Sequence, residues 1–535
     1  MESGRTEIQL KLAVSPENIA LLKTHPDFAG AFHDPTHEIL HSIYFDSDDR
    51  SLRKNGLTLR VRRVGEKNVQ TIKAVDRGAK WFERSEWEQP IEGDQPDLAR
   101  VMDTAIGGAN KVKPIFETRI ERETYHFNGN DTAIAMAVDE GQIVTNNSSL
   151  PISEIELELE HGNPAELFKI ARAINDVVPA QLNVKSKSER GYELVEKEPL
   201  TAERAYEPEL SPGMSAGRAF TLIGRSCLRH LVANVSATEN RDAEALHQMR
   251  VALRRLRAAI SLFSDVVSDD RIEAIKTELR WLAREFGPAR DLDTLVIEVL
   301  RPLRKQHANE LGLAGISKMF GRQRLKAYRR AQEAVQSTRF RKIVLDTAEW
   351  IEAGPWSMSE DPLRRAPREM PVEFHAAAQL TQRRKKIRRR GAQIGDLSAV
   401  QLHRLRIQAK KTRYAVEFFS SLYQGKKAGK RCKKVLSSLM ALQDSLGRFN
   451  DIVTRKALFE NIIAYPEHRL TEEQNRHRAF AAGLIMGHEQ AQIHQLLDRA
   501  CKAHSRFDRA KVFWKTPRND VLASQPVPAA TNQTL

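Results

Sequence analysis

The segment EIQLK, residues 7–11, alternates polar and aliphatic side chains. An alternation with a period of two predicts a β-strand, in which Glu7, Gln9 and Lys11 share one face while Ile8 and Leu10 occupy the other. One face of one strand would then carry a carboxylate, an amide and an ammonium group. This mixture of signs decides how the first 200 residues are interpreted.

The same alternation recurs in the segments LTLRVRRV, VQTIKAV, WFERSEWEQPI and ISEIELELE. Turn signals such as Asn55-Gly56 separate these segments, as expected for an antiparallel sheet. Residues 163–179 instead have helical periodicity, with Pro164 near the start of the helix. We therefore predict that residues 1–200 form a β-rich domain that also contains helix.

The polar residues of the predicted strands form charged pairs and ladders. The sets that share a face are Arg60 and Arg62, Thr71 and Lys73, Arg84 with Glu86 and Glu88, and Glu154, Glu156, Glu158 and Glu160. An ordinary antiparallel sheet with one solvated face explains the alternation by itself. Four like charges on one strand, however, repel unless cations offset them. Acid-rich strands beside Arg- and Lys-rich strands would suit a site for a divalent cation and phosphate, because hard cations prefer carboxylates and phosphates prefer Arg and Lys.

These segments resemble, in order, the signature motifs of the CYTH, or triphosphate tunnel metalloenzyme, family. EIQLK resembles the ExExK signature, and the other matches are LRVR, TIK, RSEWE, TRIER, AVDEGQI, EIELELEHG and KSKSERGY. The resemblance implies an antiparallel β-barrel whose interior is a tunnel, with the charged faces directed inward. It also implies hydrolysis of a triphosphate-bearing substrate with the help of a divalent cation, Mg²⁺ or Mn²⁺.

Carried over position by position, the resemblance assigns phosphate binding to Lys11, Arg60, Arg62, Lys73, Arg84, Arg119 and Lys185. It assigns metal binding to Glu7, Asp139, Glu154, Glu156 and Glu158, with Gln9, Glu86 and Glu88 as further candidates. Gln9 departs from the signature, because an amide oxygen can ligate a cation but brings no charge and cannot act as a base. Two outcomes stay open: a metal site with fewer carboxylates, or a barrel that binds without turnover.

Net charge and the spacing of apolar residues divide the chain into two parts. Residues 1–200 hold 25 Lys+Arg and 34 Asp+Glu, whereas the remaining residues hold 60 and 36, a net charge of +24. This excess indicates a polyanionic partner. Residues 198–217 contain three prolines and little periodicity, and residues 201–217 are predicted to be a linker. In residues 218–512 apolar side chains recur at spacings of three and four, which predicts an all-helical domain, and residues 513–535 are predicted to be disordered.

The helical part contains an internal repeat. LHQMRVALRRLRAAISLF and LHRLRIQAKKTRYAVEFF align without a gap. In this alignment His247, Arg250, Arg254 and Arg257 match His403, Arg406, Lys410 and Arg413. The four positions of each copy lie within roughly 80° of one helix face, at about 100° per residue. A solvated face explains one basic helix, but the same spacing in two copies favours binding of a chain of phosphates.

Residues 218–510 resemble the CHAD domain, and the repeated His/Arg helix is the most specific mark of this resemblance. The resemblance implies helical bundles around a basic groove or pore, and binding of inorganic polyphosphate. The runs RQRLKAYRR and RRKKIRRR are further candidates for a polyanion track. A solvated patch explains the second run equally well.

The sequence thus predicts a two-domain α+β protein, with an N-terminal antiparallel β tunnel barrel and a C-terminal duplicated all-α bundle. The expected function is hydrolysis of inorganic triphosphate coupled to polyphosphate binding. The alternatives are a non-catalytic polyphosphate-binding protein, a thiamine triphosphatase and an adenylate cyclase. Nucleic acid is disfavoured because no aromatic-rich RNA-binding strand is evident. Three scattered cysteines, the lack of a signal sequence and the lack of a membrane-length apolar run predict a reduced, cytoplasmic protein.

Overall fold

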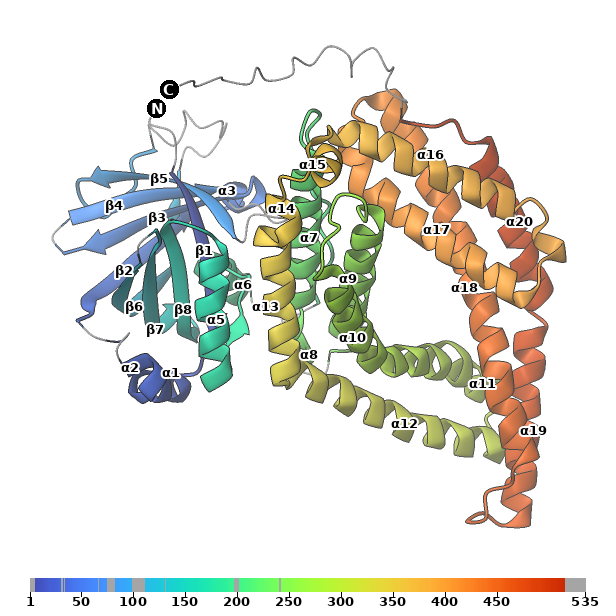
Figure 1. Cartoon of the computed structure of the whole chain (residues 1–535). Coiled ribbons are helices and arrows are strands. Elements are labelled where there is room, and N and C mark those ends of the chain that lie inside the picture. The colour runs from blue at the N-terminus through green and yellow to red at the C-terminus, as the bar shows by residue number, and fades with distance from the viewer. Residues whose placement is uncertain are drawn as a thin grey trace, which may run out of the picture.

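The computed structural model describes residues 5–29, 32, 34–65, 67–74, 82–98, 111–129, 131–196, 202–239 and 242–514 (Figure 1). Most of the tail that was predicted to be disordered, from residue 515 onward, lies outside these ranges. Across the described residues, no helix is both long and apolar enough to cross a membrane.

The N-terminal domain is a closed antiparallel barrel, as predicted. Its strands are β1 (Arg5–Ala13), β2 (Thr36–Asp46), β3 (Leu57–Val64), β4 (Lys67–Ala74), β5 (Glu83–Ile91), β6 (Lys113–Asn128), β7 (Ala133–Val144) and β8 (Ser149–His161). Neighbours follow the order β5-β4-β3-β2-β6-β7-β8-β1, and β1 also pairs with β5, which closes the ring. The short β9 (Gln181–Leu182) extends the sheet beside β1.

On β1, the apolar residues face the outside of the barrel. Leu10 and Leu12 of β1 are fully buried in a cluster that also contains Leu167 and Phe168 of α5 (Ala165–Val177). Further short helices, α1 (Pro16–Thr24), α2 (Pro26–Ala29) and α3 (Ser51–Lys54), belong to the same domain (Figure 1). Because successive side chains of a strand point to opposite faces, an apolar outer face directs Gln9 and Lys11 into the barrel.

The C-terminal domain is helical, as predicted. It comprises α7 (Ala216–Val232), α8 (Val235–Glu239), α9 (Ala243–Leu262), α10 (Ile272–Asp293), a π-helical turn (Thr294–Leu300), α11 (Arg301–Gln306), α12 (Leu311–Gln336), α13 (Thr338–Ala353), α14 (Pro355–Met358), α15 (Pro362–Glu369), α16 (Val372–Arg390), α17 (Ala399–Phe419), α18 (Lys426–Ala464), α19 (Glu472–Gln490) and α20 (Ile493–Arg509). The repeated sequence forms α9 and α17, which contact each other, and each is followed by a long helix, α10 or α18. The duplication in the sequence is therefore a duplication of a helix pair.

The two domains share one continuous hydrophobic cluster, which runs from the barrel strands into α7, α9 and α13. In Figure 1, α5 and α6 (Lys187–Glu196) lie between the barrel and α13. Arg172 of α5 donates to Glu349 of α13 at 2.5 Å, and the guanidinium of Arg225 stacks over the Phe82 ring at 5.5 Å. Between the domains, Leu210 is buried, so the predicted linker is in part packed against the helices.

Candidate active site and anion pocket

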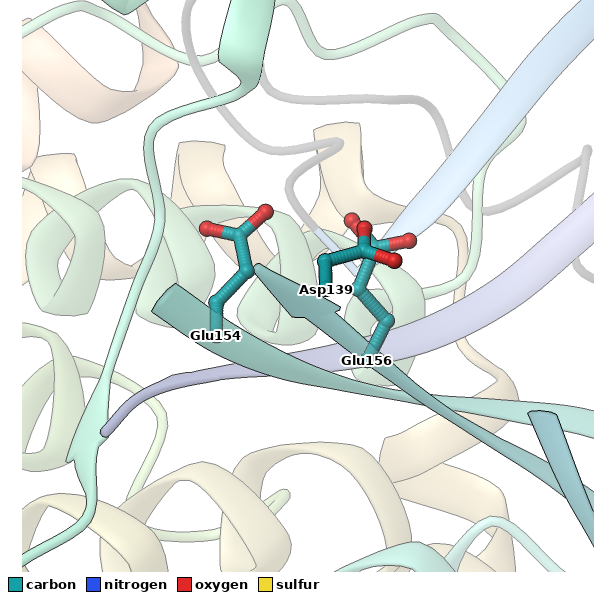
Figure 2. A group of neighbouring side chains, drawn as sticks. All are labelled: Asp139, Glu154 and Glu156. Atoms are coloured by element: carbon teal, nitrogen blue, oxygen red, sulfur yellow. The ribbon is translucent and has the colours of Figure 1, made fainter. Parts of the chain in front are cut away.

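Three carboxylates meet inside the barrel. Asp139 of β7 pairs directly with Glu154 of β8, and Glu156 lies two residues further along the same face. Oxygen atoms of the three side chains lie within 4.8 Å of one another (Figure 2). Asp139 and Glu154 are fully buried. Ala137 stands opposite Glu156 on β7, and its small side chain leaves room for the longer acid.

Four cations surround these carboxylates. The Lys187 ammonium donates to Asp139 at 2.6 Å, to Glu154 at 2.5 Å and to Glu156 at 2.9 Å. Arg122 donates to both oxygens of Asp139 at 2.6 Å and to Glu156 at 2.8 Å. Arg190 donates to Glu154 at 2.6 Å, and Lys11 donates to Glu156. The cluster is therefore a buried network in which each acid contacts at least two basic groups.

The cations determine how the acids titrate. Burial is the largest single influence on Glu156 and by itself would raise its pKa, but Lys11, Lys187 and Arg122 together hold that pKa well below its usual value. The pKa values of Asp139 and Glu154 are lowered in the same way. Burial acts to lower the pKa of Lys187, but the three carboxylates outweigh it and raise that pKa. At neutral pH the site therefore holds carboxylates and ammonium groups in their charged forms.

Two further cations, Arg60 and Arg62, lie on β3, opposite Tyr44 and Ser42 of β2. Arg62 donates to Ser42 at 3.1 Å, and burial together with nearby Arg60 lowers the pKa of Arg62 to about 10. Tyr44 is buried directly opposite Arg60; burial raises its pKa, but Arg60, Arg62 and Lys187 more than offset this and lower it. Concentrated positive charge that lowers a phenol pKa is an environment that favours an anion.

The remaining predicted barrel residues are placed as follows. Glu88 is half exposed and accepts from Thr71 at 2.8 Å and from Arg60 at 3.5 Å. Gln9 is buried directly opposite Glu158, and Lys73 pairs with the Glu86 position across β4 and β5. The backbone register sets Glu7 opposite Arg84. The side chains of Glu7, Arg84 and Glu86 lie outside the described part of the structure.

Two predicted phosphate ligands lie apart from the carboxylate cluster, and for Arg119 the position contradicts a role inside the barrel. Arg119 lies three residues before Arg122 on β6, so it points to the opposite, outer face, where it is 60% exposed and donates to Glu117. Lys185 donates to Glu193 and Glu203, both at 2.8 Å. Burial acts to lower the pKa of Lys185, but these two acids raise it.

Their places are taken by residues that the assignment missed or left aside. Arg122 shares the inward face of β6 with Thr118 and Ile120, which the structure buries. Lys187 lies in the same KSK motif as Lys185. Arg190 follows Lys187 by three residues, and the two share a face of α6 because residues three apart are neighbours on a helix. The alternation of strand residues gave no reason to assign Lys187 and Arg190 to the site, because both lie on a helix.

The second site is a pocket of about 540 Å³ between the two repeats. Seven Arg and Lys side chains, His247 and four acids line it. The basic residues are Arg250, Arg254 and Arg290 from the first copy, Arg406, Lys410 and Arg448 from the second copy, and Arg499 from α20. The matched helix positions of both copies thus converge on one cavity, whose lining carries an excess of positive charge.

Several buried nitrogen atoms of these side chains lack a hydrogen-bond partner in the described part of the chain. Among the described residues, the buried Nε atoms of Arg254 and Arg406 and the buried Nδ1 atom of His247 have no hydrogen-bond partner. Burial first, and then Arg254, Arg406, Arg413 and Arg250, lower the pKa of Lys410 to about 7. Buried donors that remain unsatisfied are costly in the free protein, which indicates a site for a ligand rich in acceptors.

Three repeat residues lie outside this lining. His403 contacts Asn450 at 2.5 Å between its Nδ1 and the amide oxygen. Arg413 donates to Glu417 at 2.5 Å and to Gln443 at 3.0 Å, and Gln443 itself lines the pocket. Burial, and then Arg280, lower the pKa of Arg257. The two copies are thus similar in sequence but not in the side chains that they present to the cavity.

Comparison with known proteins matches residues 5–192 to the CYTH domain and residues 222–460 to the CHAD domain. The inorganic triphosphatase of Haemophilus influenzae is 30% identical over 203 residues, which are 36% of this chain and 56% of that protein. The chain therefore spans little more than half the length of this curated relative.

Two solved structures are similar to parts of the chain. The CHAD domain from the plant Ricinus communis is 28% identical, with a TM-score of 0.47, and the match covers 57% of this chain and 96% of that one. HpAC1 from Hippeastrum, described as having a dominant triphosphatase activity, is 19% identical, with a TM-score of 0.28, and the match covers 35% of this chain and 95% of that one. The chain therefore contains a CYTH domain, which includes the barrel, followed by a CHAD domain in its helical part.

Proposed function

We propose that the barrel is a metal-dependent triphosphatase that hydrolyses inorganic triphosphate, and that the helical domain binds polyphosphate. The observation that carries the proposal is the buried trio Asp139, Glu154 and Glu156, which lies inside a closed barrel and is surrounded there by Lys11, Arg122, Lys187 and Arg190. The identity to an inorganic triphosphatase over the barrel supports it.

The residues present fit a hard divalent cation. Carboxylate oxygens are the ligands that Mg²⁺ and Mn²⁺ prefer, and three of them converge here with oxygens within 4.8 Å of one another. Asp139, Glu154 and Glu156 would hold the ion, with Glu158 as a further candidate. When bound, the ion would neutralise phosphate charge and lower the pKa of a coordinated water molecule.

The chain's own cations would bind and orient the substrate. Arg60 and Arg62 would present guanidinium groups to phosphate oxygens, and the Tyr44 hydroxyl, which is hydrogen-bonded to Arg60, would lie beside them. Lys11, Lys187 and Arg122 would divide their hydrogen bonds between the carboxylates and the substrate. Holding a triphosphate rigidly among fixed charges accounts for most of the rate gain in phosphoryl transfer.

The direct test is phosphate release from inorganic triphosphate by the full-length protein with Mg²⁺ or Mn²⁺, compared with ATP and thiamine triphosphate. We expect inorganic triphosphate to be the best substrate, because it carries no nucleobase or thiazolium ring that the barrel would have to bind. If no substrate releases phosphate while polyphosphate still binds, the barrel is a binding module and the triphosphatase proposal is wrong.

A substitution at Gln9 tests how strongly the barrel binds a divalent cation. The substitution Gln9→Glu adds a carboxylate opposite Glu158, in a buried position inside the barrel. If the cation is held near this row, we expect Mn²⁺ to bind about tenfold more tightly, because a charged ligand replaces a neutral one. Calorimetric titration of both proteins with Mn²⁺ measures the difference. Equal or weaker binding by the variant would show that position 9 lies outside the metal site.

A further inference from the structure

The helix α6 carries two of the four cations of the carboxylate cluster, so its position determines the site. Its C-terminal part is anchored by the barrel: Tyr192 donates to the buried Asp46 at 2.9 Å and stacks edge-on against Phe116. Gly191 is packed so closely on Phe116 that an added Cβ would lie 2.2 Å from the ring. Barrel residues thus hold α6 from Gly191 onward.

The N-terminal turn of α6 is held differently. The Glu189 carboxylate accepts from the backbone N–H of Ser186 at 2.8 Å and from its hydroxyl at 3.0 Å, and the Glu189 N–H donates back to Ser186 Oγ at 3.1 Å. This reciprocal cap fixes the turn from which Lys187 projects. The other oxygen of Glu189 accepts from Arg229 at 2.5 Å.

Arg229 belongs to α7 of the helical domain. It is buried, and its second terminal nitrogen donates to Glu203 at 2.8 Å. Glu203 is itself tied to the helical domain, since its backbone N–H and carbonyl bond to the Asn234 side chain. Burial acts to lower the pKa of Arg229, but Glu189 and Glu203 outweigh it and raise that pKa. A guanidinium in this setting is a rigid, permanently charged clamp.

We propose that Arg229 is a positioning residue of the barrel site: through Glu189 it fixes the start of α6, so that Lys187 and Arg190 reach the carboxylate cluster. The helical domain thereby completes a site that it does not itself line. The structural part rests on the contacts above, and the consequence for substrate rests on the proposed function. Outer contacts that orient ligand-binding groups at metal sites typically change affinity by about 10- to 100-fold.

The test uses full-length protein and two readouts. The first is hydrogen exchange of the amides at residues 186–190. The second is calorimetric affinity for imidotriphosphate, a non-hydrolysable probe, with Mn²⁺ present. For Arg229→Met we expect faster exchange and about tenfold weaker binding. Arg229→Lys, which keeps the charge, should restore at least part of both.

Two further variants separate positioning from general stability. Glu189→Gln keeps an acceptor for the Ser186 cap but loses the ion pair, so it should reproduce the Arg229→Met defect, and the double variant should add little to either single one. The control Arg172→Met removes an ion pair across the same domain interface, away from α6, and should leave both readouts unchanged.

The outcomes are distinguishable. If the wild type does not bind imidotriphosphate, the proposed function is wrong, and hydrogen exchange alone still decides whether Arg229 clamps α6. If Arg229→Met and Glu189→Gln exchange and bind as the wild type does, the positioning role is wrong. The positioning role is also wrong if these two variants change the exchange rate and the affinity only as much as Arg172→Met does. Should Arg229→Met fail to fold, Glu189→Gln and Arg229→Lys carry the test.

Discussion

Replacing Glu156 with glutamine is expected to lower triphosphate hydrolysis by roughly 100-fold or more. Glu156 accepts hydrogen bonds from Lys11, Arg122 and Lys187, and it is one of the three converging carboxylates. The amide has the same size but no charge. The site therefore binds the divalent cation more weakly, and one negative charge is lost among Lys11, Arg122 and Lys187. The measurement is kcat and KM for inorganic triphosphate at saturating Mg²⁺.

The matched control for this change is Glu117→Gln. Glu117 accepts from His41 and Arg119 on the outer face of β6, away from the carboxylate cluster. We expect the control to keep its activity and to lose little stability, since exposed ion pairs contribute roughly 0–1 kcal/mol. If Glu156→Gln stays folded and hydrolyses triphosphate at the wild-type rate, the three carboxylates are not the reaction centre.

Binding of polyphosphate to the helical domain is expected to weaken as the pH rises through and above 7. The pKa of Lys410 in the free protein is about 7, because burial and four neighbouring arginines disfavour its charged form. A bound polyanion favours the charged form and raises that pKa. Affinity is therefore full below pH 7, falls by up to about tenfold per pH unit above it, and levels off above the pKa of the complex.

The substitution Lys410→Arg separates this effect from other titrations. A guanidinium stays charged over the whole range, so the affinity of the variant should be nearly independent of pH between 7 and 9. His247 lines the same pocket, but burial and then Arg290 lower its pKa, which moves its titration further from this pH range. Titration calorimetry with a defined polyphosphate at constant ionic strength measures both proteins. A wild type without pH dependence would contradict the role of Lys410 in binding.

Much of the barrel was predictable because strand alternation is a local property. The period of two along EIQLK, LTLRVRRV and ISEIELELE separated charged from aliphatic faces, and the structure directs Gln9, Lys11 and Glu156 inward. Alternation does not specify which residue of one strand stands beside which residue of another. The row Arg122, Asp139, Glu154 arises only from the register of β6, β7 and β8.

The same limit explains Lys185 and Lys187. Both lie in one short motif, and their chemistry is identical. Lys187 reaches the carboxylates because α6 begins there and is capped by Glu189. Lys185 precedes the helix and turns toward Glu203, on the segment that leads into the helical domain. Without the three-dimensional path of the chain, no property of the two side chains tells them apart.

By itself, the sequence determined the two-domain organisation, the strand faces and the duplicated basic helix, because periodicity and repetition are properties of the linear chain. Only the tertiary structure decided which charges meet: the four cations around Asp139, Glu154 and Glu156, and the subset of repeat residues that lines the pocket. It also decided that Arg229 of one domain contacts Glu189 of the other. Electrostatic interactions depend on distance and burial, and both are set by strand register and helix packing between segments far apart in the sequence.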